Sequence, residues 1–215
     1  MSIDSVAGKD TKFCLFLDFD GVLFDTVKES YAVCLSMLNK DLDIEDISFE
    51  TVLYLQNRAY RYLVAPAWNY KYLLECLGEE GSVDENFNRM VSGASPADYA
   101  GFEKAFFEQR KKLKAENYAK WLDLNSAFEF FYAIKRWLDR TNHEAYIVTT
   151  KDKETVLNLL GLHSMAVDED KVLDKVAYSQ QGSKSSMING VIKDLQVSHA
   201  VFVDDSAFHL SLIHI

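Results

Sequence analysis

Proline, glycine and cysteine are scarce in this 215-residue chain, which has 2 Pro, 9 Gly and 3 Cys. So few breaks favour long helices over a β-sandwich with many turns. The cysteines, Cys14, Cys34 and Cys76, are odd in number and widely spaced. This pattern predicts reduced, buried thiols and excludes a disulfide framework, so we expect a cytoplasmic protein.

Long apolar runs and an excess of basic residues are also missing. No stretch has the length of a signal peptide or a membrane span, so we expect no membrane partner. The chain carries 23 Lys and Arg against 33 Asp and Glu, for a formal charge of −10. This balance argues against a nucleic-acid partner, which needs a basic surface. The hydrophobic content of 48% is enough for a packed core.

Unbroken apolar runs predict strands that are covered on both faces, as in a parallel sheet. The clearest runs are residues 13–17, 145–149 and 200–203, and shorter strands are expected near 165–167 and 176–178.

Helical patterns separate these strands. Capping boxes at Thr26 and Ser126 predict two helix starts, Asp152 and Gly161 predict the two ends of a third helix, and Ser183 predicts the start of a fourth. Strand and helix in alternation indicate a parallel α/β sheet.

A block of about 95 residues after the first strand has helical patterns only. Its expected helices are residues 49–63, 68–77, 84–91 and 97–119. We therefore predict an α/β, Rossmann-like parallel sheet core formed by residues 1–25 and 122–215, with an all-α domain inserted at residues 26–121.

Residues capable of chemistry follow each expected strand, where an open parallel sheet binds its ligands. Each of them alone has an ordinary explanation as a cap, a turn or a solvent-facing side chain, and their convergence is the signal. They are Asp18, Asp20 and Gly21 after the first strand, Thr149 and Thr150 after the second, Lys184 at a helix start, and Asp204 and Asp205 after the last strand.

The four carboxylates, Asp18, Asp20, Asp204 and Asp205, predict a bound cation. Two like charges about 4 Å apart repel by roughly 4 kcal/mol at an effective dielectric near 20. Lys184 alone offsets only part of this repulsion. Oxygen ligands suit a hard divalent ion, and Mg²⁺ suits a site that also holds phosphate.

Four segments resemble, in order, the motifs of the haloacid dehalogenase superfamily. DFDGVLFDT at residues 18–26 resembles the first motif, and IVTTK at 147–151 is similar to the second. Lys184 stands where the third-motif lysine would fall, and VFVDD at 201–205 resembles the fourth motif. The helical insert after the first motif looks like the α-helical cap of small-molecule phosphatases and phosphosugar mutases of that superfamily.

The resemblance implies a role for each catalytic position. Asp18 would attack phosphorus to form an aspartyl-phosphate, and Asp20 would act as general acid and then base. Thr149, Thr150 and Lys184 would bind the phosphoryl group, with Lys184 also neutralising charge.

The resemblance also implies a Mg²⁺ cofactor. Its ligands would be the Asp18 carboxylate, the Asp20 carbonyl and Asp204, with Asp205 in support. The expected substrate is a small phosphorylated metabolite.

Three features depart from the family pattern. Thr150 stands where Asn is common, and Ser185 replaces the Pro of many capped phosphatases. The chain ends about ten residues after Asp205, so we expect residues 210–215 to fold over the last strand, or that strand to form a homodimer contact.

Side chains of the insert have two interpretations. Its aromatic residues line a substrate cleft or, more commonly at helical spacing, form a core. Arg58 and Arg61 are candidate readers of phosphate or carboxylate, and the basic run at 110–114 either meets an anion or is a solvated helix face. The aromatic residues are Tyr54, Tyr60, Tyr62, Trp68, Tyr70 and Tyr72.

Several functions stay open beside the leading one, a Mg²⁺-dependent phosphatase. A phosphosugar mutase uses the same chemistry, and a catalytically silent interaction protein is the last alternative. Dehalogenation is disfavoured because it needs no acid such as Asp20. A receiver domain is disfavoured because its acceptor Asp belongs to a middle strand and it lacks a large helical insert.

Overall fold

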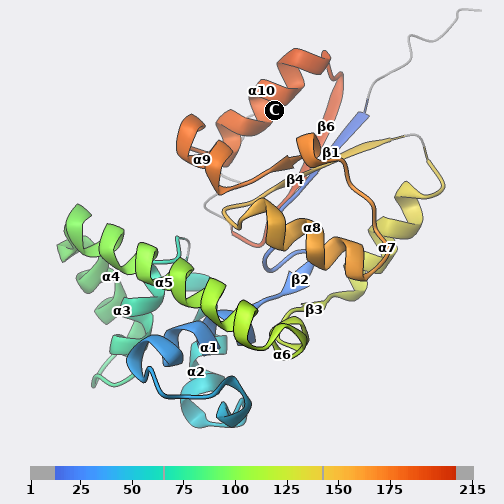
Figure 1. The fold of residues 1–215 in the computed structure, drawn as a ribbon. Coiled ribbons are helices and arrows are strands. Elements are labelled where there is room, and N and C mark those ends of the chain that lie inside the picture. Colours follow the sequence, from blue (N-terminus) through green and yellow to red (C-terminus); the bar gives the residue numbers. More distant parts are fainter. Residues whose placement is uncertain (1–12, 65, 142, 207–215) are drawn as a thin grey trace, which may run out of the picture. The chain divides into compact units, whose positions relative to one another are not determined.

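The structure is a computed structural model that describes residues 13–64, 66–141 and 143–206, and the chain divides into two compact units (Figure 1). The sheet unit comprises the chain up to Phe24 and from Ala127 onward, and the helical unit is Asp25–Ser126. Asp25 and residues 122–126 therefore belong to the helical unit, whereas the sequence prediction assigned them to the core. The helix α6 (Tyr118–Asp123) explains the later boundary, because its Trp121 is fully buried and donates to Glu29 of the helical unit.

A parallel four-stranded sheet forms the centre of the sheet unit, in the order β5-β4-β1-β6. Leu17 pairs with Ile147 on one side and with Val203 on the other, so the three carboxyl ends lie at one edge. The α/β prediction and its three main strands are confirmed. The strands are β1 (Phe13–Leu17), β4 (Glu144–Val148), β5 (Val172–Leu173) and β6 (His199–Val203).

Helices cover both faces of this sheet (Figure 1). Alternate residues of a strand point to opposite faces, so Cys14 and Phe16 pack against Met187 and Ile188 of α10, while Leu17 faces the other side. Figure 1 shows α9 and α10 on one side and α7 and α8 on the other. These helices are α7 (Glu129–Leu138), α8 (Lys153–Leu162), α9 (Lys175–Gln181) and α10 (Lys184–Leu195).

The two short strands expected between α8 and α10 were wrong. Residues 165–167 form no strand. The chain instead turns at the end of α8, where Ser164 has a φ of 56° and the Met165 N–H donates to the Leu160 carbonyl. Residues 176–178 belong to α9, since the Asp174 carboxylate accepts the first N–H groups of that helix. The segment between α8 and α10 that does join the sheet is β5, which follows a short 3-10 helix, Glu169–Lys171.

The expected helix caps are confirmed at Asp152 and Ser183, whose side chains accept backbone N–H groups of α8 and α10. The capping boxes expected at Thr26 and Ser126 do not form. Thr26 precedes α1 (Val27–Leu38), but it is the Asp25 carboxylate that accepts the Val27 N–H, at 3.2 Å. The segment Ser126–Ala127 is β3, which pairs with β2 (Phe24–Asp25) where the chain passes between the units.

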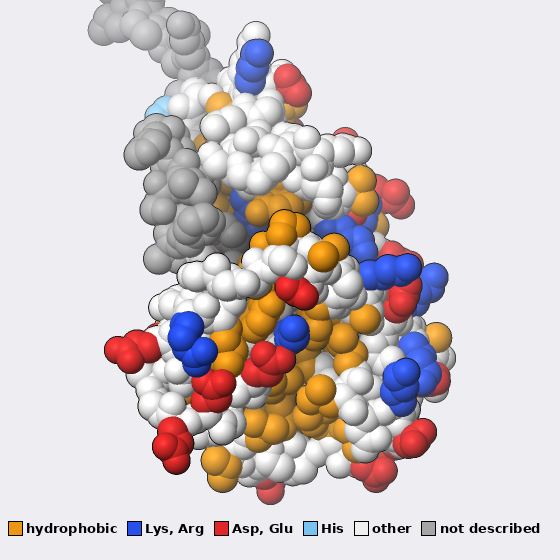
Figure 2. Space-filling model, turned by 90° about the vertical axis from the view of Figure 1, so that its left-hand side faces the viewer, with side chains coloured by type: hydrophobic (Ala, Val, Ile, Leu, Met, Phe, Trp, Pro, Cys, Tyr) orange, Lys and Arg blue, Asp and Glu red, His pale blue; other side chains and the backbone are white. Residues whose placement is uncertain are grey.

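The helical unit packs around one apolar cluster that includes Tyr54, Tyr70 and Tyr72. These three aromatics are core, whereas Tyr62 is 68% exposed. Figure 2 shows further apolar side chains at the surface of this unit. Besides α1, its helices are α2 (Val52–Ala59), α3 (Asn69–Cys76), α4 (Val83–Gly93), α5 (Pro96–Glu116) and α6 (Tyr118–Asp123), with 3-10 turns at Ile44–Asp46 and Arg61–Leu63.

The three cysteines are buried and form no disulfide, as predicted. Burial is also the main cause that raises the pKa of the Cys34 thiol. In the part of the chain that the structure describes, no helix is both long and apolar enough to cross a membrane.

The last strand was expected to be buried, and this was wrong. β6 lies at one end of the strand order, and Val201 is 45% exposed. Residues 210–215, which we expected to cover this strand, lie outside the described residues.

Candidate active site

Asp18 is the first residue beyond β1, and it is buried. Its backbone N–H continues the sheet ladder by donating to the Val203 carbonyl at 2.9 Å. Its Oδ1 accepts the Phe19 N–H at 2.8 Å. The sheet therefore fixes the backbone of Asp18 at the carboxyl edge of the strands, and the Phe19 N–H orients its carboxylate.

A tight loop follows Asp18 and carries Asp20. The Phe19 carbonyl accepts the N–H groups of Leu23 and Phe24, and the Gly21 N–H donates to the Phe24 carbonyl at 2.8 Å. Gly21 has a φ of +86°, and a Cβ atom at this position would collide with the Asp205 carboxylate. Glycine is therefore required both by the backbone conformation and by the close approach of Asp205.

Lys184 joins two of the predicted carboxylates. It is the first residue of α10, and its buried Nζ lies 2.8 Å from Asp18 Oδ2 and 2.7 Å from Asp204 Oδ2. Asp204 also accepts the Ser206 N–H at 2.7 Å. The structure thus brings together three side chains that are far apart in the sequence.

The pKa of Asp18 is raised from 3.8 to about 7, and burial of the carboxyl group is the largest cause. Lys184 opposes this shift, and Asp204 and Asp20 add smaller contributions to it. Burial also lowers the pKa of Lys184, but Asp18 and Asp204 outweigh that effect, so this pKa is raised and the ammonium stays charged.

Three carboxylates form a group of oxygens with the spacing of a cation site. Oxygen atoms of Asp18, Asp204 and Asp205 all lie within 4.8 Å of one another. Asp18 and Asp204 are buried and Asp205 is exposed. Such an all-oxygen donor set fits Mg²⁺, which binds proteins through one or two carboxylates and keeps several waters. The predicted fourth ligand, the Asp20 carbonyl, stays a prediction.

The Asp20 side chain is instead engaged by a lysine to which the sequence analysis gave no role. Lys151 Nζ lies 3.0 Å from Asp20 Oδ1, and the Lys151 side chain is only 1% exposed. A signal was present in the sequence, since Lys151 follows Thr149 and Thr150 directly at a strand end. It was overlooked because a lysine in a loop is usually solvated.

Thr149 directly follows β4 and is buried. Its N–H donates to the Leu173 carbonyl at 2.9 Å, and its Oγ1 accepts the Lys151 N–H at 3.1 Å. An oxygen that accepts this bond keeps its own O–H proton for donation to another acceptor. Thr150 is half-buried, and its substrate-binding role stays a prediction.

Two ammonium groups, those of Lys151 and Lys184, bond to carboxylates of the site. Three carboxylates also bring oxygens within 4.8 Å of one another, and a divalent cation there would offset their mutual repulsion.

The arginines proposed as anion readers have partners inside the helical unit. Arg58 pairs with Asp25 at 2.9 Å, and Arg61 donates to the Val64 carbonyl. Arg110 is buried and forms a two-bond ion pair with Glu29. Arg110 is therefore neither an exposed anion site nor part of a solvated face.

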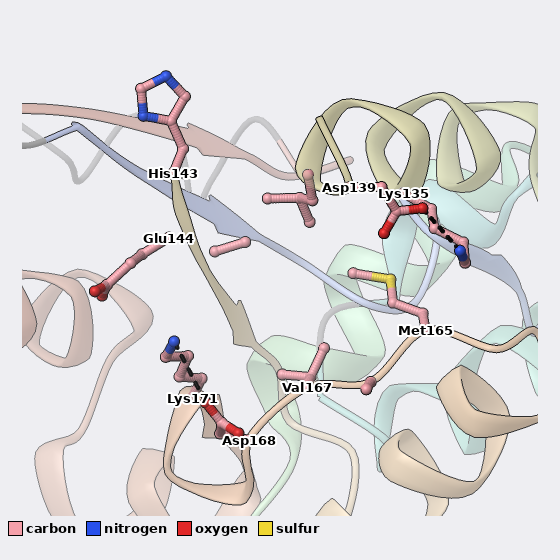
Figure 3. A pocket seen from close by; sticks show the side chains of 11 residues that line it. Lys135, Asp139, His143, Glu144, Met165, Val167, Asp168 and Lys171 are labelled. Atoms are coloured by element: carbon pink, nitrogen blue, oxygen red, sulfur yellow. Dashed lines mark hydrogen bonds and ion pairs between the residues drawn. The ribbon is translucent and has the colours of Figure 1, made fainter. Parts of the chain in front are cut away.

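A separate hollow of about 190 Å³ lies beside the first residues of β4, at the opposite end of the sheet (Figure 3). Four of its charged side chains pair with one another, Lys135 with Asp139 at 3.0 Å and Lys171 with Asp168 at 3.4 Å. Figure 3 shows these pairs along the rim. None of the predicted site residues lines this hollow.

Three solved structures share this architecture at low sequence identity. A haloacid dehalogenase-like hydrolase from Streptococcus pneumoniae is 14% identical, with a TM-score of 0.52 over 94% of this chain and 80% of that one. A predicted phosphatase from Clostridium acetobutylicum is 15% identical, with a TM-score of 0.52 over 89% and 74%. The chain has a haloacid dehalogenase-like fold.

A third structure with the haloacid dehalogenase-like fold is a subfamily IA hydrolase of the superfamily from Geobacter sulfurreducens. It is 17% identical, with a TM-score of 0.50 over 93% of this chain and 81% of that one. No protein-family model and no curated protein matches the sequence. At such identities the likeness establishes the fold, and the chemistry must be argued from the side chains.

Proposed function

We propose that this protein is a Mg²⁺-dependent phosphatase that hydrolyses a small phosphorylated metabolite through an aspartyl-phosphate. The observation that carries the proposal is the buried Lys184 between Asp18 and Asp204, beside an oxygen group that also includes Asp205. A nucleophilic carboxylate, a fixed cation and a cation site at one sheet edge are the parts that phosphoryl transfer needs.

In the first step the Asp18 carboxylate oxygen forms a bond to phosphorus, and the bond from phosphorus to the ester oxygen breaks. The leaving oxygen takes a proton from Asp20. Lys184 offsets the negative charge on Asp18 and the phosphoryl group. The O–H of Thr149 donates to a phosphoryl oxygen, since Oγ1 already accepts the Lys151 N–H.

In the second step a water molecule attacks phosphorus and gives its proton to Asp20. The bond between Asp18 and phosphorus breaks, so inorganic phosphate leaves and the carboxylate is restored. Asp20 thus regains the proton that it gave up in the first step, and two easier displacements replace one difficult one.

Asp18, Asp204 and Asp205, with the Asp20 carbonyl, would hold Mg²⁺. A bound Mg²⁺ supplies Lewis-acid stabilisation of the charge on the phosphoryl oxygens.

Release of inorganic phosphate from a panel of phosphomonoesters tests the proposal, first with Mg²⁺ and then with EDTA. We expect release that requires Mg²⁺. An isomeric phosphate ester in place of free phosphate would identify a mutase. An inactive wild type that also fails to bind beryllium fluoride with Mg²⁺ would indicate a catalytically silent protein.

A further inference from the structure

The backbone of Lys151 is held at both of its polar groups. Its N–H donates to Thr149 Oγ1 at 3.1 Å, and its carbonyl accepts the Lys175 N–H at 3.2 Å. The first bond ties it to the end of β4, and the second ties it to the start of α9. The side chain therefore leaves from a fixed point.

The ammonium of Lys151 reaches a partner 131 residues earlier in the chain. Its Nζ lies 3.0 Å from Asp20 Oδ1, and the Lys151 and Asp20 side chains are 1% and 21% exposed. A buried ammonium loses several kcal/mol of hydration free energy, and replacing a buried ion pair by apolar side chains is often neutral or stabilising. Packing alone therefore does not account for a lysine here.

The two buried lysines bond to different carboxylates of the site. Lys184 bonds to Asp18 and Asp204, which belong to the oxygen group, whereas Lys151 bonds to Asp20. Among the described residues, that oxygen group contains Asp18, Asp204 and Asp205 and does not contain the Asp20 carboxylate. The Asp20 carboxylate thus lies outside the group of oxygens that would hold the cation.

We propose that Lys151 is a positioning residue for Asp20, which orients its carboxylate for proton transfer and keeps it out of the cation site. The inference rests on the proposed phosphatase function. A group displaced by about 1 Å from its productive geometry loses up to about 10²-fold in rate. Loss of Lys151 should therefore impair the steps that need Asp20, and the first of them, the protonation of the leaving oxygen, is the one that depends on the ester.

The test compares Lys151→Met with Lys153→Met on two esters, a phenyl phosphate with an activated leaving group and an alkyl phosphate. Lys153 is the matched control, because its Nζ donates to the Glu169 carbonyl instead. We expect Lys151→Met to lower kcat/KM, which reports on the first step, by about 10- to 100-fold on the alkyl ester and by less than threefold on the activated ester. Lys153→Met should match the wild type on both esters.

A double variant separates positioning from an independent role. Asp20→Asn with Lys151→Met should be no slower on the alkyl ester than Asp20→Asn alone, because the residue being positioned is already gone. If Lys151→Met does not fold, Lys151→Gln serves in the same comparison.

Three outcomes would overturn the inference: unchanged rates in Lys151→Met, equal losses on both esters, or multiplied losses in the double variant. A wild type that releases no phosphate from any ester would instead overturn the proposed function.

Discussion

Each of the two units buries an ion pair among its described residues, and the two arrangements balance their charges differently. In the helical unit, Arg110 Nε and Nη2 donate to the two oxygens of Glu29 at 2.6 and 2.9 Å, and Trp121 Nε1 donates to the same carboxylate at 3.4 Å. In the sheet unit, one Lys184 ammonium serves both Asp18 and Asp204.

The arrangement in the helical unit is a structural ion pair, whereas the arrangement in the sheet unit has the features of a ligand-binding site. One guanidinium and one carboxylate cancel, and both carboxylate oxygens of Glu29 have donors, so this pair needs no further charge. The carboxylates around Lys184 outnumber it, and burial raises the pKa of Asp18 to about 7. A buried group whose pKa is shifted by burial and by specific charged partners is a candidate functional site.

Removal of the nucleophile should give the largest effect. We expect Asp18→Asn to lower phosphate release by about 10⁴-fold or more, without loss of folding, because the shape of the side chain is kept. Steady-state rates with circular dichroism measure both. Activity within tenfold of wild type would show that Asp18 is not the nucleophile.

Breaking the balanced pair should affect stability instead of chemistry. Arg110→Met leaves the Glu29 carboxylate buried without its partner, so the free energy of unfolding should fall by about 3–5 kcal/mol. Urea unfolding measures this change. Lys112→Met is the control on the same helix, because its pair with Glu116 is exposed, and it should cost at most about 0.5 kcal/mol. Similar losses in the two variants would contradict the contrast.

The unbalanced site should be stabilised by ligands. Beryllium fluoride with Mg²⁺ should raise the melting temperature by several degrees, since a ligand bound only by the folded state stabilises it. Asp204→Ala should abolish the shift, and Asp168→Ala, which removes a carboxylate paired with Lys171, should keep it. A shift that survives Asp204→Ala would place the cation elsewhere.

The smallest effect concerns pH without metal. The pKa of Asp18 is higher in the folded protein than its ordinary 3.8, so the folded state holds this proton more tightly. This contribution to stability is complete below about pH 4 and is lost as the pH rises through about 7. In EDTA, wild type should therefore melt a few degrees below Asp18→Asn at pH 8 and at the same temperature at pH 4. If the melting temperatures of the two proteins differed by the same amount at pH 4 and at pH 8, the pKa shift would be contradicted.

Local patterns predicted most of the fold. Unbroken apolar runs identified β1, β4 and β6, and the caps at Asp152 and Ser183 were correct. The errors fell on short segments, where few residues carry a pattern. At Thr26 and Ser126 the capping-box sequence was present, but a neighbouring carboxylate and a strand pairing replaced the bond.

The sequence by itself determined which chemical groups stand at the ends of the strands, because each strand and its following residues form a local pattern. Only the tertiary structure decided which charges are balanced. The sequence pattern around Arg110 is typical of a solvated helix face, but in the structure Arg110 pairs with Glu29, 81 residues away. No role for Lys151 was predicted from the sequence, but in the structure it bonds to Asp20, 131 residues away. Electrostatic pairing depends on distance in space and on exclusion of water, and neither quantity is encoded in the spacing of residues along the chain.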